Sequence, residues 1–172
     1  MDLCVFPNQK RLEDFLAVTG RAGPTELVWN VPSVEEVGPT KPCPNPELPL
    51  KLFYGGSLSP ERLPWSVLEE IWALKGRVNL DIVGYPNYEN RDFPEKIKHR
   101  DGNRGTVRYH GAVPRRGDLF RVMDSCEVAL CLMPLQSSYA GMQTMAGASN
   151  KPFDAMARGL AVVVSDLEER IS

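Results

Sequence analysis

The chain has 172 residues, of which 42 % are hydrophobic and 24 % charged, and its formal net charge is −2. This composition is typical of a globular protein with enough apolar residues for one core and part of another. The small negative charge predicts no general attraction to nucleic acid, and no apolar run approaches the roughly 20 residues that would cross a bilayer.

The N-terminus and the cysteines exclude further classes. The first residues, Met1 to Cys4, lack the basic start and apolar core of a signal peptide, so we expect a cytoplasmic protein. The four cysteines and two histidines stand at no metal-ligand spacing, so we expect no metal site and no disulfide framework.

Residues 1–32 read as a short strand, helix and strand. The apolar runs 3–6 and 26–29 predict strands, and residues 11–18 have the apolar spacing of an amphipathic helix. Since about thirty residues cannot form a core of their own, we interpret 1–32 as the tail of one domain. Residues 33–50 are rich in proline and predict a linker, or a strap lying across a surface.

From residue 51 onward, apolar strand patterns alternate with helical ones. Strands are expected at 51–54, 78–83, 106–110, 128–132 and 161–164, and helices near 65–72, 95–100 and 151–158 and after Asp118. The strands are apolar on both faces, which predicts a doubly wound, Rossmann-like parallel sheet covered by helices on each side. Ligands of such sheets bind at the carboxyl ends of the strands.

The first candidate loop at that edge is residues 55–62 (GGSLSPER). Gly55 and Gly56 allow the backbone to approach a ligand, and Ser59-Pro60 favours a helix start with free amides. Arg62 could add a bidentate contact to a phosphate. The loop contains neither a Walker A motif nor GxGxxG, and a tight turn with a solvated arginine is the alternative interpretation.

The second candidate is the helix start at residues 149–154 (SNKPFD), which follows a long loop of small and polar residues. Ser149 or Asn150 can cap the helix, and Lys151 lies beside free amides, where a phosphate would bind. Asp154 is expected in the first turn, as an acceptor for two sugar hydroxyls. Acids favour helix N-termini in any case, which leaves a purely structural role open.

These segments together resemble a known family. The chain resembles the C-terminal domain of GT-B glycosyltransferases in four segments: 55–62, 80–84 (LDIVG), 107–114 (VRYHGAVP) and above all 147–166 (GASNKPFDAMARGLAVVVSD). The retaining group-1, or family 4, type is the most similar. The resemblance spans roughly residues 51–166 and, more loosely, 1–32.

The resemblance implies a function and a set of site residues. Such enzymes transfer a hexose from a UDP-, GDP- or ADP-sugar to a glycan or lipid-linked acceptor, in the synthesis of polysaccharides and glycoconjugates. Carried over, Asp154 would hold the ribose, and Val113 would approach the base. The diphosphate or sugar side would be faced by Gly55, Gly56, Ser57, Arg62, Ser149, Asn150 and Lys151, of which Arg62 and Lys151 are the catalytic candidates. No cofactor besides the donor is implied.

Two departures from the family pattern concern the sugar end of the site. The family often has a Glu-x7-Glu pair, but Ala146 stands where the first acid would be. Ser57 occupies a position where an arginine that binds phosphate is common. The sequence instead fits the variant form Ser-Asn-Lys-x-Phe-Asp.

The resemblance also implies a domain organisation. Residues 1–32 would end an N-terminal acceptor domain, 33–50 would be the interdomain linker, and 51–172 would be a nucleotide-sugar domain truncated at its C-terminus. We therefore expect a fragment that does not catalyse transfer alone, and the full-length enzyme could associate peripherally with a membrane. A non-catalytic nucleotide or phosphosugar-binding module is the alternative left open. A response-regulator-like domain would need acids after the first strand, and Tyr54-Gly55-Gly56 supplies none.

Overall fold

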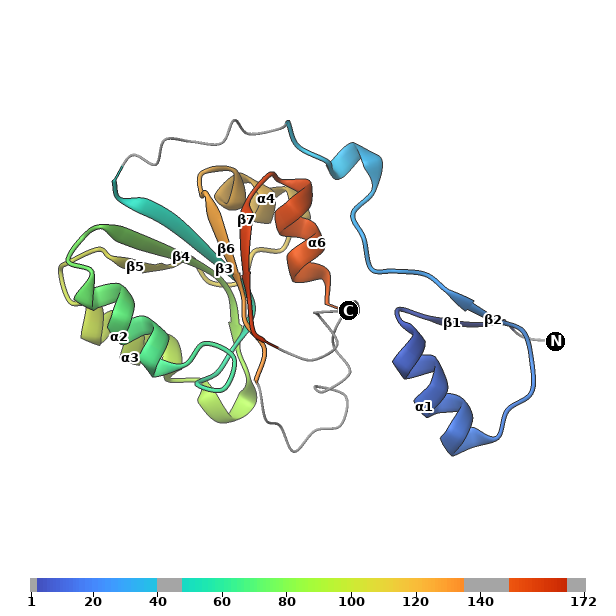
Figure 1. Cartoon of the computed structure of the whole chain (residues 1–172). Coiled ribbons are helices and arrows are strands. Elements are labelled where there is room, and N and C mark those ends of the chain that lie inside the picture. Colours follow the sequence, from blue (N-terminus) through green and yellow to red (C-terminus); the bar gives the residue numbers. More distant parts are fainter. Residues whose placement is uncertain (1–2, 40–47, 135–148, 167–172) are drawn as a thin grey trace.

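The computed structural model describes residues 3–39, 48–134 and 149–166 (Figure 1). Within them, the larger sheet has five parallel strands in the order β5-β4-β3-β6-β7. Its strands are β3 (Leu50–Leu58), β4 (Val78–Pro86), β5 (Val107–Tyr109), β6 (Val128–Cys131) and β7 (Ala161–Val164).

Helices cover both faces of this sheet (Figure 1). On one face, α2 (Trp65–Ala73) and α3 (Phe93–Asp101) pack through residues such as Leu68 and Ile97. On the other face, α4 (Arg116–Asp124) and α6 (Asn150–Ala157) pack through Met123 and Ala155. Two apolar layers therefore enclose the strands, and the doubly wound α/β fold predicted from the sequence is confirmed.

The two longest strands do not end where the glycines predicted. We expected Gly55-Gly56 and Gly84 to terminate strands, but the pairing of β3 with β4 continues through Gly56 opposite Gly84 to Leu58 opposite Pro86. Main-chain hydrogen bonding between the neighbouring strands outweighs the local turn signal, because glycine has the conformational freedom to remain in the ladder. The candidate glycines thus lie in β3 itself.

Two helix starts differ from the prediction, and a third agrees with it. Ser59-Pro60 forms a turn in which the Ser59 carbonyl accepts bonds from the amides of Arg62 and Leu63, at 3.0 and 2.9 Å, and α2 begins later, at Trp65. Helix α4 is capped at Arg115, so Asp118 lies inside its first turn. Helix α6 is capped at Ser149, as predicted, but without a side-chain capping bond.

The N-terminal residues form a separate two-stranded parallel sheet. Strand β1 (Cys4–Phe6), helix α1 (Gln9–Thr19) and strand β2 (Thr25–Leu27) make a βαβ unit, in which the Asn8 side chain caps the helix by accepting from the Arg11 amide at 2.9 Å. The single-turn helix η1 (Val34–Glu36) follows. We call residues 33–38 the strap, because they cross to the α4/α6 side of the sheet.

The strap is held there by main-chain contacts. The Gly38 amide donates to the Ala157 carbonyl of α6 at 2.8 Å. Trp29, just before the strap, meets Phe153 of α6 edge-on, with ring centroids 5.7 Å apart. The proline-rich region therefore begins as a specifically bound segment, in agreement with the strap interpretation.

Candidate functional site

The sheet order creates a crevice between β3 and β6. The chain proceeds from β3 outward to β4 and β5, then returns to add β6 and β7 on the other side, so the strand order reverses at β3. Strand β3 pairs with β6 at Leu52 opposite Val128 and Phe53 opposite Ala129, whereas its pairing with β4 runs on to Leu58. The two strands thus separate at their carboxyl ends, where doubly wound sheets bind ligands.

A pocket of about 250 Å³ occupies this crevice. Strands β3 and β6 form its floor, and residues at the start of α4 and α6 form its walls. Its lining comprises Phe53, Gly55, Gly56, Arg116, Leu119, Met123, Ala129, Leu130, Cys131, Asn150, Lys151 and Asp154. The charged residues of the lining, Arg116, Lys151 and Asp154, all come from the two helices.

Gly56 and Gly84 keep one side of the crevice open. Gly56 has φ +124°, and a Cβ there would lie 2.8 Å from Cε of Lys151. Its neighbour Gly84 has φ +155°, and a Cβ there would lie 1.8 Å from the Gly56 carbonyl oxygen. The positive φ favours glycine at both positions. At 84 a side chain would also clash with the backbone of β3, whereas one at 56 would displace the end of the flexible lysine.

Lys151 reaches across Gly56 to Tyr54. Its Nζ lies 3.5 Å from the Tyr54 hydroxyl and 4.5 Å from the centre of the Tyr54 ring. The hydroxyl in turn donates to the Ser57 carbonyl at 2.9 Å. Burial raises the pKa of Tyr54 well above its ordinary value, and the nearby charge of Arg62 opposes that rise. The Tyr54 hydroxyl therefore lies beside the Lys151 ammonium and within the field of the Arg62 charge.

Asp154 forms the anionic wall of the pocket. Its side chain is 8 % exposed, and Arg116 donates to both carboxylate oxygens, from Nη2 at 2.6 Å and from Nη1 at 3.3 Å. Burial raises the pKa of Asp154, and the guanidinium of Arg116 opposes that rise. The prediction that Asp154 lies in the first turn of α6 is wrong, because it lies one turn further on. The general preference of acids for helix N-termini therefore does not account for it.

The structure brings together five of the nine predicted site residues in the pocket: Gly55, Gly56, Asn150, Lys151 and Asp154. Arg62 does not line the pocket, and its charge acts on Tyr54 of β3. Ser57 contributes its carbonyl to Tyr54, Val113 packs against the core of the α4/α6 face, and Ser149 is buried at the helix cap. Ala146 and most of the loop before α6 lie outside the described residues.

Sequence reasoning missed Arg116 and Tyr54 as parts of the site. In the sequence, Arg115-Arg116 is only a basic pair, since nothing local links it to a carboxylate 38 residues away. Tyr54 has the pattern of an ordinary strand residue. A signal does exist for Arg116, because it opens the helix that follows a strand end, where the anions of such sheets bind.

Two further observations concern metals and membranes. Among residues 3–39, 48–134 and 149–166, no group of three or more His, Cys, Asp or Glu residues could hold a metal ion. In that same part of the chain, no helix has the length and apolar character required to span a membrane.

The fold and the pocket define a class: a doubly wound α/β domain with a pocket at its switch point, bordered by cations and one buried carboxylate. The family model of the group 1 glycosyl transferases matches residues 50–171, which include the entire five-stranded sheet. The chain belongs to this family.

Two solved structures are similar in fold. One is the crystal structure of Anabaena Alr3699/HepE in complex with UDP and glucose, with a TM-score of 0.63 and 17 % identity over 98 % of this chain and 46 % of that one. The other is pneumococcal O-GlcNAc transferase GtfA in complex with UDP and GlcNAc, with a TM-score of 0.57 and 15 % identity over 97 % of this chain and 30 % of that one. This chain thus spans less than half the length of either. The search among curated proteins gave no match.

Proposed function

We propose that the chain is the donor-binding part of a retaining glycosyltransferase, which transfers a hexose from a nucleotide-sugar to a glycan or lipid-linked acceptor. The observation that carries the proposal is the pocket at the β3/β6 crevice, where Lys151 and the buried Asp154 face the same space. Membership of the group 1 family supports it. The two structures of similar fold were solved with UDP, so a UDP-hexose is the first donor to test, followed by GDP- and ADP-sugars.

The proposed roles follow from charge and position. Asp154 accepts hydrogen bonds from the ribose hydroxyls, because a carboxylate is an acceptor only. Lys151 and Arg62 neutralise the diphosphate, with Asn150, Ser149 and the first amides of α6 beside them. Gly55, Gly56 and Ser57 let the backbone approach the ligand, and Val113 lies on the side of the base.

The same charges suit the chemical step. Departure of the sugar leaves negative charge on the diphosphate, and fixed cations that are aimed at that charge stabilise the transition state. The proposal assigns this task to Lys151 and Arg62. The acceptor would be positioned by a second domain, because transfer requires donor and acceptor to be held in one geometry.

The proposed domain organisation is an acceptor-domain tail at 1–32, a linker at 33–50 and a nucleotide-sugar domain from 51 onward. The parallel β1-α1-β2 unit supports the first part, because parallel strands are normally buried on both faces. In this unit Leu3 and Val5 are 58 % and 53 % exposed. They would be covered by the rest of a second α/β domain.

Titration calorimetry with UDP, GDP, ADP and UDP-glucose tests the proposal on the 172-residue chain. We expect one nucleoside diphosphate to bind, and Lys151→Ala to raise its Kd by about 10-fold, the value of one charge-assisted hydrogen bond. The control is Lys96→Ala, which removes an exposed lysine on α3, on the opposite face. Binding of none of these ligands at millimolar concentration would refute the proposal, as would equal weakening by the two substitutions.

A further inference from the structure

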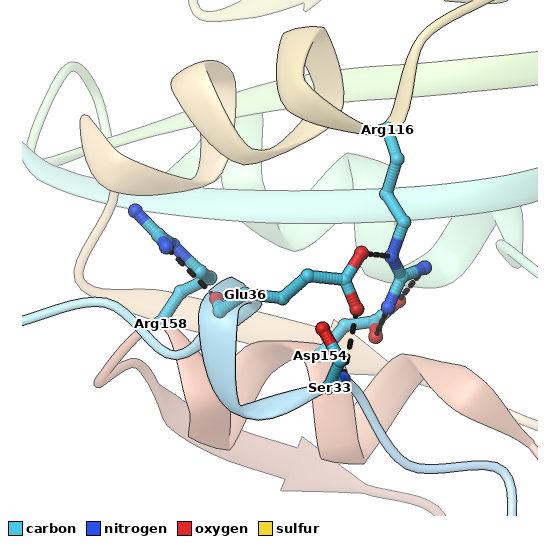
Figure 2. A network of polar contacts seen from close by, with 5 residues as sticks. All are labelled: Ser33, Glu36, Arg116, Asp154 and Arg158. Carbon is cyan, nitrogen blue, oxygen red and sulfur yellow. Dashed lines mark hydrogen bonds and ion pairs between the residues drawn. The ribbon is translucent and has the colours of Figure 1, made fainter.

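Arg116 lies at the centre of a polar network that joins the pocket to the strap (Figure 2). Its Nη1 and Nη2 donate to Asp154, and its Nε donates to Oε1 of Glu36 in a short contact. Three donors of one guanidinium are thus divided between a pocket carboxylate on α6 and a carboxylate of the strap. These groups come from three segments that are far apart in the sequence, so the network exists only in the folded chain.

Glu36 is itself fixed on both sides. Its Oε2 accepts from the Ser33 amide at 3.0 Å, which closes the turn of η1. Its carbonyl accepts from Nη1 of Arg158 at 3.0 Å (Figure 2), and Arg158 is paired with Asp124 through Nε at 2.8 Å and Nη2 at 2.6 Å. The strap is therefore attached to the ends of both α4 and α6.

Packing restricts Arg116 as well. Its guanidinium lies over the ring of Phe120, 4.8 Å from the ring centre, and Arg158 lies over the same ring at 5.1 Å. The Arg116 side chain is 38 % exposed, and the carboxylate that it pairs with is 8 % exposed. The planar Arg116 guanidinium is packed against the Phe120 ring and bonded to Glu36 through Nε, so it has little freedom to rotate. It therefore determines the orientation of the Asp154 carboxylate.

The bonds from Arg116 leave part of Asp154 available to a ligand. An ionised carboxylate has roughly four acceptor positions, and the guanidinium uses one on each oxygen. One position on each oxygen then remains for a pair of adjacent hydroxyls. The same contact opposes the rise in the Asp154 pKa that burial causes, and a charged acceptor forms stronger hydrogen bonds to hydroxyls than a neutral one.

We propose that Arg116 is a positioning residue that holds the Asp154 carboxylate oriented toward the ribose of the nucleotide, and that Glu36 of the strap completes this arrangement. The inference rests on the proposed function and extends it: recognition of the ribose depends on the linker segment as well as on the donor domain. Displacement of the strap would weaken ribose recognition without removing any residue from the pocket.

The test compares UDP with 2′-deoxy-UDP, because the difference between their affinities isolates the ribose contact. For the unmodified chain we expect UDP to bind about 10-fold more tightly, the value of one good hydrogen bond to a charged group. Arg116→Met should reduce this ratio to about 1, and Arg116→Lys should restore it only in part, because an ammonium cannot form the bidentate fork. Glu36→Gln should reduce the ratio by about 2- to 3-fold, which corresponds to a fraction of a kcal/mol.

Two controls separate positioning from folding. Arg121→Met removes an exposed arginine from the same helix and should leave the ratio unchanged. In an Asp154→Asn chain, Arg116→Met should change UDP affinity no further, because the oriented carboxylate is already lost. A ratio preserved in Arg116→Met and in Glu36→Gln would overturn the inference. Equal affinities of the unmodified chain for UDP and 2′-deoxy-UDP would also overturn the inference, but would leave the proposed nucleotide binding intact. Absence of UDP binding would instead overturn the proposed function itself.

Discussion

Replacing Arg116 by Met leaves the Asp154 carboxylate buried without its cation. The side chain of Asp154 is 8 % exposed, and both of its oxygens accept from Arg116. Loss of a partner from a buried charged group costs about 1–3 kcal/mol, and more when both partners are fully buried. Arg116 is 38 % exposed, so water can reach part of the site, and we expect a cost of about 1–3 kcal/mol rather than more. For a chain of this size we expect the Tm to fall by about 3–9 °C.

Arg121→Met provides a matched control for that loss. Arg121 lies on the same helix and pairs with Asp118, but its side chain is 78 % exposed. Exposed ion pairs contribute about 0–1 kcal/mol, so this variant should unfold within about 3 °C of the unmodified chain. Both variants lose one positive charge and gain the same side chain, so the difference between them reports the burial of the partner carboxylate.

A double-mutant cycle identifies the partner. Asp154→Asn replaces the carboxylate by a neutral group of similar size, so Arg116→Met should cost about 1–2 kcal/mol less in that background. Urea unfolding followed by circular dichroism, at equal m-values, gives the four free energies of unfolding. If Arg116→Met is as costly in the Asp154→Asn background as in the unmodified chain, or no costlier than Arg121→Met, the ion pair does not stabilise this structure.

The pH dependence has a definite sign. Burial raises the pKa of Asp154 above its value in the unfolded chain, and the guanidinium of Arg116 opposes that rise. In Arg116→Met this opposing charge is absent, so the pKa of Asp154 should rise further. Between the two pKa values the folded state binds more protons, so its stability decreases as the pH rises through that window. The cost of Arg116→Met should therefore be small below pH 3.8, the ordinary value for this carboxyl, and should grow toward neutral pH. An equal cost at about pH 3.5 and about pH 7 would show that the carboxylate charge is not involved.

Glycine substitutions at the crevice give the remaining predictions. Gly84→Ala places a Cβ 1.8 Å from a backbone oxygen of β3 and should lower the free energy of unfolding by more than about 4 kcal/mol. The control is Gly76→Ala, which is also at positive φ but has nothing within 4 Å, and it should lower that free energy by about 1–2 kcal/mol. Similar urea midpoints for the two variants would contradict the strand geometry. Gly56→Ala should displace Lys151 and raise the Kd for nucleotide by about 10-fold, with no further loss when Lys151→Ala is added, because both changes remove one contact. Additive losses in calorimetry would separate the two residues.

The sequence was sufficient for the class of fold and for most of the elements. Strand β7 is found at Ala161–Val164, as the apolar run predicted, and helix α6 begins after Ser149, as its capping residue indicated. These features depend on residues that are close together in the chain, where periodicity and capping chemistry act directly. The prediction failed at Gly55, Gly56 and Gly84, where a local turn signal competed with pairing to a neighbouring strand.

The candidate site, like the fold, could be predicted from the sequence only in part. By itself the sequence determined that Asn150, Lys151 and Asp154 belong to one helix, because their spacing along the chain fixes their separation. Only the tertiary structure decided that β3 and β6 are neighbours that separate after Phe53 and Ala129, and that Arg116 and Glu36 meet Asp154. Those contacts depend on how α4, α6 and the strap pack over one face of the sheet. No local pattern encodes such packing, because Arg116 and Glu36 appear as ordinary solvated charges until the fold brings them to Asp154.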